Sequence, residues 1–178
     1  MNQTILVADK NGKHTGEYIS KEIAHTGRGK RHLAISVLLY NNKSQVLLQH
    51  RKHKIHDDIW EFTGSTHHLH RNDGTDETSE EATYRCLRRE YGIAERIPLK
   101  ILGGVNYFAA DGKFCENEYD VILVGEFNGK LRPDEQVSYS YKWVDEKEFL
   151  KDIGENPKKY APWAVEAIKI VKKNIKGV

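Results

Sequence analysis

The feature that most constrains the fold is an apolar run at residues 33–40, LAISVLLY. The run contains β-branched residues and one polar side chain, Ser36, a pattern typical of a buried strand. The turn-forming residues Asn41-Asn42-Lys43 follow, and residues 45–50 (QVLLQH) form a second segment with an apolar centre. Two such segments joined by a short turn predict a β-hairpin.

Weaker patterns place the other elements around this hairpin. The helix that ends at Gly92 starts at Thr78 or Ser79, and Ser79 is its candidate cap. Asp111-Gly112 is the expected turn between two later strands. We expect strands at 4–8, 101–109, 118–127 and 139–144, and further helices at 146–151 and 163–175. This order favours an α/β (α+β) fold, a mixed β-sheet sandwiched between helices in a single domain over residues 1–178.

Composition excludes several classes of protein. The 28 Lys and Arg residues nearly balance the 26 Asp and Glu residues, so no nucleic-acid partner is expected. No apolar run approaches the roughly 18 residues of a membrane span, and the N-terminus does not resemble a secretory signal. Two cysteines are too few for a disulfide scaffold. We therefore expect a cytoplasmic protein, and the sequence indicates no protein partner.

Residues 51–77 show little periodicity, and so long a segment is typical of a functional loop. Six of the nine histidines lie in or beside it: His50, His53, His56, His67, His68 and His70. His25 and His32 flank a segment rich in Gly, Arg and Lys before the first buried strand. Most of these histidines are expected to be solvated.

Two glutamates, Glu116 and Glu118, stand two residues apart at the start of an expected strand. Residues at this spacing point to the same face of a strand, so the two carboxylates lie side by side. Like charges this close repel unless a cation, a base or a proton lies between them. The pair is either solvated at a strand edge or, with imidazoles, part of a divalent metal site.

The segment 74–93, GTDETSEEATYRCLRREYGI, resembles the Nudix box, G-x5-E-x7-R-E-U-x-E-E-x-G-U, in which U is apolar. Glu77, Arg85, Leu87, Glu90, Gly92 and Ile93 match positions of that motif. Cys86 and Arg89 stand at two of its glutamates, and Arg71 stands at its first glycine. Because those glutamates hold magnesium ions against a diphosphate, their loss disfavours ordinary Nudix hydrolysis.

From about residue 5 to residue 171 the chain resembles type I isopentenyl-diphosphate isomerase, a divergent branch of the Nudix fold. The matching segments are HTGEYISKEIAHT, RHLAISVLLYN, ATYRCLRREYGI, NYFAADGKFCENE and YAPWAVEAI. In that family three histidines and two glutamates surround one divalent metal. The residues that match this set are His25, His32, His67, Glu116 and Glu118.

The resemblance also implies the substrate contacts. Glu90 matches the glutamate that helps to bind Mg²⁺ on the substrate diphosphate, and Lys21, Arg51 and Lys54 match the basic residues that hold it. The loop before Lys54 is about two residues shorter here, and a family arginine falls on Cys86. The implied cofactors are therefore Mg²⁺ with the diphosphate and one further divalent ion, Zn²⁺, Mn²⁺ or Mg²⁺, in the His/Glu site.

The implied catalytic residues are Ser65, Glu118, Tyr107 and Trp163. Ser65 replaces the family's catalytic cysteine, and Thr66 replaces the glycine after it. Since a serine hydroxyl is a far weaker acid than a thiol of pKa about 8.5, Ser65 is expected to move a proton less readily.

Together these residues predict a metal-dependent isomerase of isoprenoid biosynthesis that interconverts isopentenyl and dimethylallyl diphosphate through a carbocation. A Nudix-type hydrolase of a nucleoside or other small diphosphate is the alternative. A third hypothesis is that the protein is a diphosphate or nucleotide sensor without catalytic activity. Release of phosphate or nucleotide would indicate the hydrolase, and binding without turnover the sensor.

Overall fold

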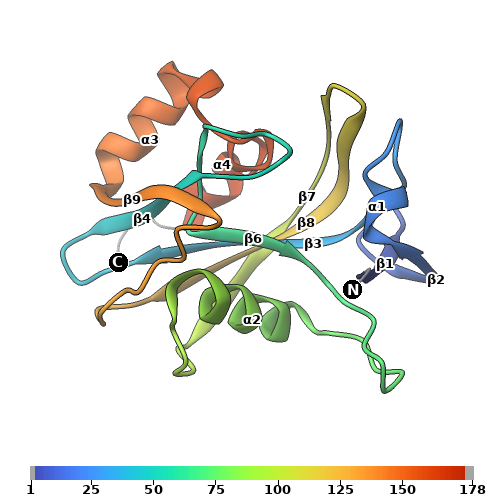
Figure 1. Cartoon of the computed structure of the whole chain (residues 1–178). Coiled ribbons are helices and arrows are strands. Elements are labelled where there is room, and N and C mark those ends of the chain that lie inside the picture. Colours follow the sequence, from blue (N-terminus) through green and yellow to red (C-terminus); the bar gives the residue numbers. More distant parts are fainter. Residues whose placement is uncertain (1–2, 175–178) are drawn as a thin grey trace.

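A curved mixed sheet forms the centre of the computed structural model, which describes residues 3–174 (Figure 1). Helix α2 (Ser79–Tyr91) lies on one side of this sheet, and α3 (Glu146–Glu155) and α4 (Pro162–Asn174) lie on the other. Two shorter helical elements are α1 (Lys21–Ala24) and the 3₁₀ turn η1 (Pro157–Lys159). The sandwich expected from the sequence is therefore confirmed.

The central strand is β3 (His32–Tyr40), the apolar run of the sequence. It pairs antiparallel with β6 (Gly64–His67) and parallel with β8 (Phe114–Glu126), which pairs in turn with β7 (Leu99–Asp111). Strands β1 (Thr4–Ala8) and β2 (His14–Ser20) extend the sheet beyond the start of β3.

The hairpin partner of β3 is β4 (Gln45–Arg51), but the two strands pair only at Tyr40 and Val46. Strand β4 then diverges and pairs with β9 (Ser138–Asp145) and β5 (Trp60–Glu61). The sheet therefore opens between β4 and β6.

Both faces of β3 are buried, which explains its lack of a polar face. Ile35, Val37 and Leu39 pack toward α2 in one apolar cluster. Leu38 packs in a second cluster with residues of α3 and α4, which includes Trp163. Because side chains alternate along a strand, His32, Ala34 and Ser36 face the same side as Leu38.

Several local predictions need correction. Thr78, not Ser79, caps α2: its hydroxyl accepts from the backbone N–H of Glu81, whose carboxylate accepts from the Thr78 N–H. Gly92 ends the helix with φ 65°, as expected. The loop at 51–77 contains β5 and β6. Strands β7 and β8 and helix α3 are longer than predicted, and β2 and α1 were missed. The last residue of the predicted helix 163–175 lies outside the described residues.

Within residues 3–174, none of the helices combines the length and the apolar character that crossing a bilayer requires.

Candidate metal centre and substrate cavity

Four neighbouring strands place polar side chains on one face of the sheet. In the β6–β3 pair, His67 stands opposite Ala34, and in the β3–β8 pair His32 stands beside Glu118. Tyr107 on β7 is the antiparallel partner of Glu118. The register of the sheet therefore gathers two imidazoles, a carboxylate and a phenol on the face that α4 covers.

Glu116 precedes Glu118 by two residues on β8 and shares its face, as the spacing predicts. His25 comes from a different direction, as the residue that ends α1. Its Nδ1 lies 2.6 Å from the carbonyl oxygen of Lys21, and its own carbonyl accepts from the N–H of Cys115 at 3.0 Å. These contacts hold the His25 ring against the start of β8.

The five residues converge on one point. Their candidate ligand atoms all lie within 4.8 Å of one another, and every one of the five residues is buried: His25, His32, His67, Glu116 and Glu118. His25 Nε2 lies 2.9 Å from Glu116 Oε2 and 3.1 Å from His67 Nε2. His67 Nε2 and His32 Nε2 lie 3.0 and 3.2 Å from Glu118 Oε1.

The arrangement fits a cation. Carbonyl oxygens of Lys21 and Lys30 lie 2.6 and 2.8 Å from Nδ1 of His25 and His32. Because a carbonyl only accepts, each Nδ1 carries a proton, and the lone pair of an unprotonated Nε2 then points into the cluster. Among the described residues, the buried Glu116 Oε2 has no hydrogen-bond donor. Lone pairs that face one another in this way are the donor set of a divalent metal.

The protonation states of the side chains in this cluster also suit metal binding. Burial, and then the charge of Lys21, lowers the pKa of His67 well below its usual value, so this ring is neutral. Burial alone raises the pKa of Glu118, but its contacts with His32 and Tyr107 outweigh it and the net shift is downward. Burial and the Glu118 carboxylate raise the pKa of Tyr107 well above 10. The resting site therefore combines a neutral imidazole at His67, a carboxylate at Glu118 and a protonated phenol at Tyr107.

A cavity of about 200 Å³ adjoins the cluster. Residues from both faces of the opened sheet line it, because β4 and β6 separate here. Its wall includes four members of the cluster, namely His25, His67, Glu116 and Glu118, together with Tyr107. Ser65 and Trp163 also line it, so the cavity contains all four of the predicted catalytic residues.

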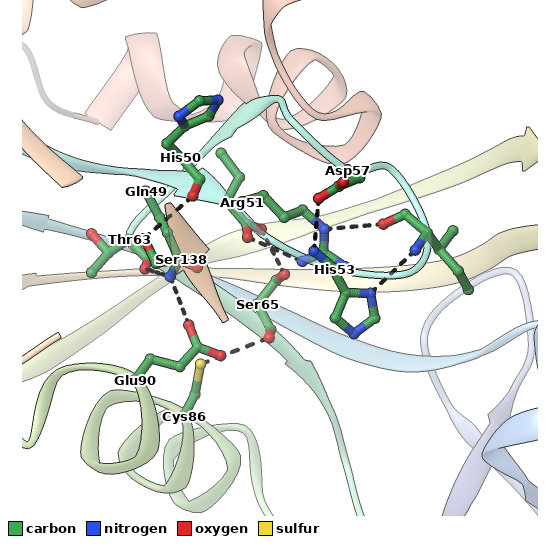
Figure 2. Close-up of polar contacts among 12 residues, drawn as sticks. Gln49, His50, Arg51, His53, Asp57, Thr63, Ser65, Cys86, Glu90 and Ser138 are labelled. Atoms are coloured by element: carbon green, nitrogen blue, oxygen red, sulfur yellow. Dashed lines mark hydrogen bonds and ion pairs between the residues drawn. The ribbon is translucent and has the colours of Figure 1, made fainter. Parts of the chain in front are cut away.

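Ser65 belongs to a hydrogen-bond network with Glu61 and Arg51 that was not predicted from the sequence. Its hydroxyl donates to Glu61 Oε2 at 2.9 Å, and Arg51 Nη1 donates to Glu61 Oε1 at 3.0 Å (Ser65 and Arg51 are labelled in Figure 2). Glu61 is 1% exposed. Its burial raises the pKa of its carboxyl, although Arg51 opposes the shift.

Trp163, at the start of α4, is 2% exposed and packs against the other side of the cavity. Its ring centroid lies 6.1 Å from that of Tyr107, and the guanidinium carbon of Arg51 lies 5.0 Å from it. The indole is therefore already next to one cation, which shows that this ring can make a cation–π contact at the cavity wall.

Basic groups also line the cavity. Lys21, Arg51 and Arg89 line it together with His53. Partial burial and the charges of Arg51 and Lys21 lower the pKa of His53 to about 4, so its ring stays neutral at pH 7. This part of the lining suits an anion.

Two predicted site residues, Lys54 and Glu90, lie apart from the metal cluster. Lys54 is exposed, does not line the cavity, and places its ammonium 4.7 Å from the ring centre of Phe114. Glu90 lines the cavity but belongs to α2, behind β6, and is not part of the metal cluster. A methyl group on Gly64 would come within 2.9 Å of Glu90 Oε2, so this glycine lets α2 approach the strand.

Three residues of this site were not predicted from the sequence: Glu61, Gln49 and Arg89. Gln49 donates its amide to Glu90 Oε2 at 2.9 Å, and Arg89 donates to Glu90 Oε1 (Figure 2 shows the Gln49 contact). The only signal in the sequence was the arginine at a glutamate position of the Nudix box.

Comparison with known families agrees with the geometry. Residues 30–164 match the NUDIX domain model, which is well over half of the chain. The chain belongs to the NUDIX family. Two solved NUDIX-like folds are similar in shape: a Deinococcus radiodurans protein (TM-score 0.70, 12% identity, 94% of this chain and 98% of that one) and the MutT protein of Methanosarcina mazei (TM-score 0.61, 18% identity, 81% and 95%).

Within the NUDIX family, the sequence relatives point to one branch. Isopentenyl-diphosphate Delta-isomerase 1 of Aromatoleum aromaticum is 31% identical over 165 residues, which cover 92% of this chain and 89% of the relative. The isopentenyl-diphosphate Delta-isomerase of Nocardia farcinica is 31% identical over 172 residues, 93% of each chain. The chain is thus a NUDIX protein of the isopentenyl-diphosphate isomerase branch, as the resemblance predicted.

Proposed function

We propose that this protein interconverts isopentenyl and dimethylallyl diphosphate. The observation that carries the proposal is one cavity lined both by a buried carboxylate–phenol pair and by basic side chains. A small diphosphate ester suits this lining, because Lys21 and Arg51 would bind its anionic part and the Glu118–Tyr107 pair would face its hydrocarbon part. The curated relatives carry the name of this activity.

Moving a double bond requires a proton at one carbon and its removal from another. Glu118 would supply the proton together with Tyr107, because the resting phenol holds a proton that it shares with Glu118 Oε2 at the cavity wall. Ser65 lines the cavity as well and would take up or return the second proton through its Oγ, while its own hydroxyl proton passes to or from Glu61 Oε2. Both groups lie in a largely buried site, which keeps water away from the carbocation.

Trp163 would stabilise that carbocation. The indole is 2% exposed and lines the cavity beside Tyr107. A desolvated cation next to an indole face gains on the order of 2 kcal/mol. Lys21 and Arg51 would hold the diphosphate, Arg51 with the part of its guanidinium that Glu61 leaves free.

His25, His32, His67, Glu116 and Glu118 would hold one divalent ion, and zinc, manganese or magnesium is compatible with imidazole and carboxylate ligands. When bound, such an ion would neutralise the crowded carboxylates and make a proton on Glu118 easier to give up. The surroundings of Glu90 do not fit a second ion, because both of its oxygens already accept hydrogen bonds from Arg89 and Gln49.

The direct test is to incubate the purified protein with isopentenyl diphosphate and a divalent metal. Formation of dimethylallyl diphosphate, detected by NMR, is the expected result. In deuterated water the product should carry deuterium, because the added proton comes from a group that exchanges with solvent. Substrate binding with no conversion under any of the three metals would contradict the proposal.

Metal binding should depend on His25. We expect the wild-type protein to bind one equivalent of Zn²⁺ or Mn²⁺ and to gain about 2.7 kcal/mol of stability at a hundredfold excess over Kd. His25→Ala should lose most of this gain. His70→Ala is the matched control, because His70 pairs with Asp76 outside the cluster. Thermal unfolding with and without metal measures both, and an equal gain in the two variants would contradict the assignment.

The metal should leave the site on acidification. Burial lowers the pKa of His25, but the neighbouring Glu116 outweighs this and the net shift is upward. A raised pKa means that His25 takes up a proton at a higher pH than an ordinary histidine. Metal affinity should therefore fall as the pH decreases from about 7 to 5, since protons compete for Nε2. Calorimetric titration across this range is the measurement, and an affinity independent of pH would count against histidine ligation.

Hydrolysis of nucleoside diphosphate derivatives should be weak. On α2, Cys86 and Arg89 replace two carboxylates, and Glu90 is already bonded to Arg89. We therefore expect little Mg²⁺-dependent release of nucleoside monophosphate from a panel of such compounds, measured by chromatography. Robust release that Glu90→Gln abolishes would instead establish the hydrolase.

A further inference from the structure

Arg89 occupies an unusual place in the cavity. It lies in the last turn of α2, lines the cavity with Lys21 and Arg51, and its side chain is 43% exposed. Its Nη2 donates to Glu90 Oε1, while the Gln49 amide donates to Glu90 Oε2 at 2.9 Å. Glu90 is 6% exposed, so both oxygens of a buried carboxylate are taken by protein donors.

A magnesium ion does not fit this arrangement. Mg²⁺ requires near-octahedral oxygen ligands at 2.0–2.1 Å and is usually held by one or two carboxylates together with substrate phosphates. Here the one carboxylate available on this part of α2 faces a guanidinium, which carries the charge that the ion would bring. To bind the ion, Glu90 would have to lose its contact with Arg89. The ion and the Arg89 guanidinium would then lie side by side as two neighbouring cations.

The arginine itself is well placed to bind an anion. Between described residues, the hydrogen bonds of its guanidinium use only Nη2, so Nε and Nη1 remain for a ligand. Arg51 has the same design: Glu61 and the carbonyl of Ile55 hold Nη1 and Nε, and Nη2 remains. A guanidinium fixed at one edge by a buried carboxylate loses little entropy when its other edge binds a phosphate.

Lys21, Arg51 and Arg89 all line the same cavity, so three cationic side chains share one small space. Cations that destabilise one another in the free protein are relieved when an anion of charge −2 or −3 binds among them.

We propose that Arg89, with Lys21 and Arg51, binds the substrate diphosphate directly and replaces the magnesium ion expected at Glu90. Glu90 then acts as a positioning residue that holds the guanidinium of Arg89. The spacing along α2 supports this replacement. Cys86 stands where a basic residue is expected, and Arg89 supplies a basic residue three positions later, on the same face of the helix. The inference deepens the proposed function by naming how its substrate's diphosphate is held.

Calorimetric binding of inorganic diphosphate tests the inference without any turnover. The wild-type protein should bind diphosphate without Mg²⁺, and millimolar Mg²⁺ should not strengthen binding. Arg89→Gln should weaken binding by about tenfold or more, since charge-assisted hydrogen bonds are lost. Arg88→Gln, which removes a neighbouring exposed arginine outside this cavity, should stay within about twofold of wild type.

Arg89→Glu supplies the reverse test, because it restores the Nudix carboxylate. This variant should bind diphosphate poorly without Mg²⁺ and recover when Mg²⁺ is added. Wild-type binding that Mg²⁺ strengthens about tenfold, with the gain lost in Glu90→Gln, would overturn the inference. So would unchanged binding in Arg89→Gln, or no diphosphate binding by the wild type. Diphosphate binding that follows this pattern in a protein that does not isomerise would leave the inference standing and remove the proposed function.

Discussion

Replacing Glu118 by glutamine is expected to reduce isomerisation by about 10⁴-fold or more, below the limit of detection in an ordinary assay. Glu118 Oε1 lies between His32 and His67, and Oε2 accepts the hydrogen bond of Tyr107. The substitution removes the group proposed to deliver the proton and leaves an amide that cannot deliver it. The measurement is product formation from isopentenyl diphosphate over hours rather than minutes.

A matched control separates this loss from damage to the strand. Glu126→Gln changes an exposed residue at the other end of β8 and should keep full activity. Metal content distinguishes the two roles of Glu118. If Glu118→Gln keeps one equivalent of metal but has no activity, the proton-transfer role is supported. Activity close to wild type in Glu118→Gln would eliminate the proposed mechanism.

The convergence of the five candidate ligands was predictable because much of it depends on strand periodicity. Glu116 and Glu118 stand two apart on β8, and a period of two places both on one face wherever the strand goes. The buried run at 33–40 likewise fixes β3 as the central strand. What the residues alone did not give was the partner of each strand. That information came from the resemblance to a family, which placed His25, His32 and His67 beside these carboxylates.

The segment 51–77 shows where local patterns fail. Strands β5 and β6 contain two and four residues, too few for a period to be read. They form because β5 pairs with the edge of β4, and β6 pairs with the edge of β3, after the β3–β4 hairpin diverges. The four-residue helix α1 was missed for a similar reason, since its ends are held by a Ser20 cap and by contacts with β8.

Side-chain pairing was the least predictable part of the site. Glu61 looked like an ordinary acidic residue beside Trp60, yet it is buried between Arg51 and Ser65. Arg89 was noted only as the loss of a glutamate, whereas the structure shows it bonded to Glu90. In both cases the partner lies on another element, so the sequence shows an unusual residue but not the contact that explains it.

Ser65 should control the rate once Glu118 is intact. Ser65→Cys is expected to increase isomerisation by about tenfold, and Ser65→Ala to decrease it by about 10²-fold or more. A thiol of pKa about 8.5 gives up its proton far more easily than a serine hydroxyl, and alanine has no proton to move. Initial rates for the three proteins at one pH, with metal content checked for each, are the measurement.

The contact between Ser65 and Glu61 explains how a serine could take part in proton transfer. Its hydroxyl donates to Glu61 Oε2 at 2.9 Å, and burial raises the pKa of that carboxyl, so a proton on Ser65 has a nearby group with which to exchange. Glu61→Gln should therefore lower the rate of the wild type more than that of Ser65→Cys, whose thiol needs less help. If Ser65 only shapes the cavity, the serine, cysteine and alanine proteins will all bind the substrate and isomerise it equally or not at all. That result would remove Ser65 from the mechanism and, in the second case, the isomerase assignment with it.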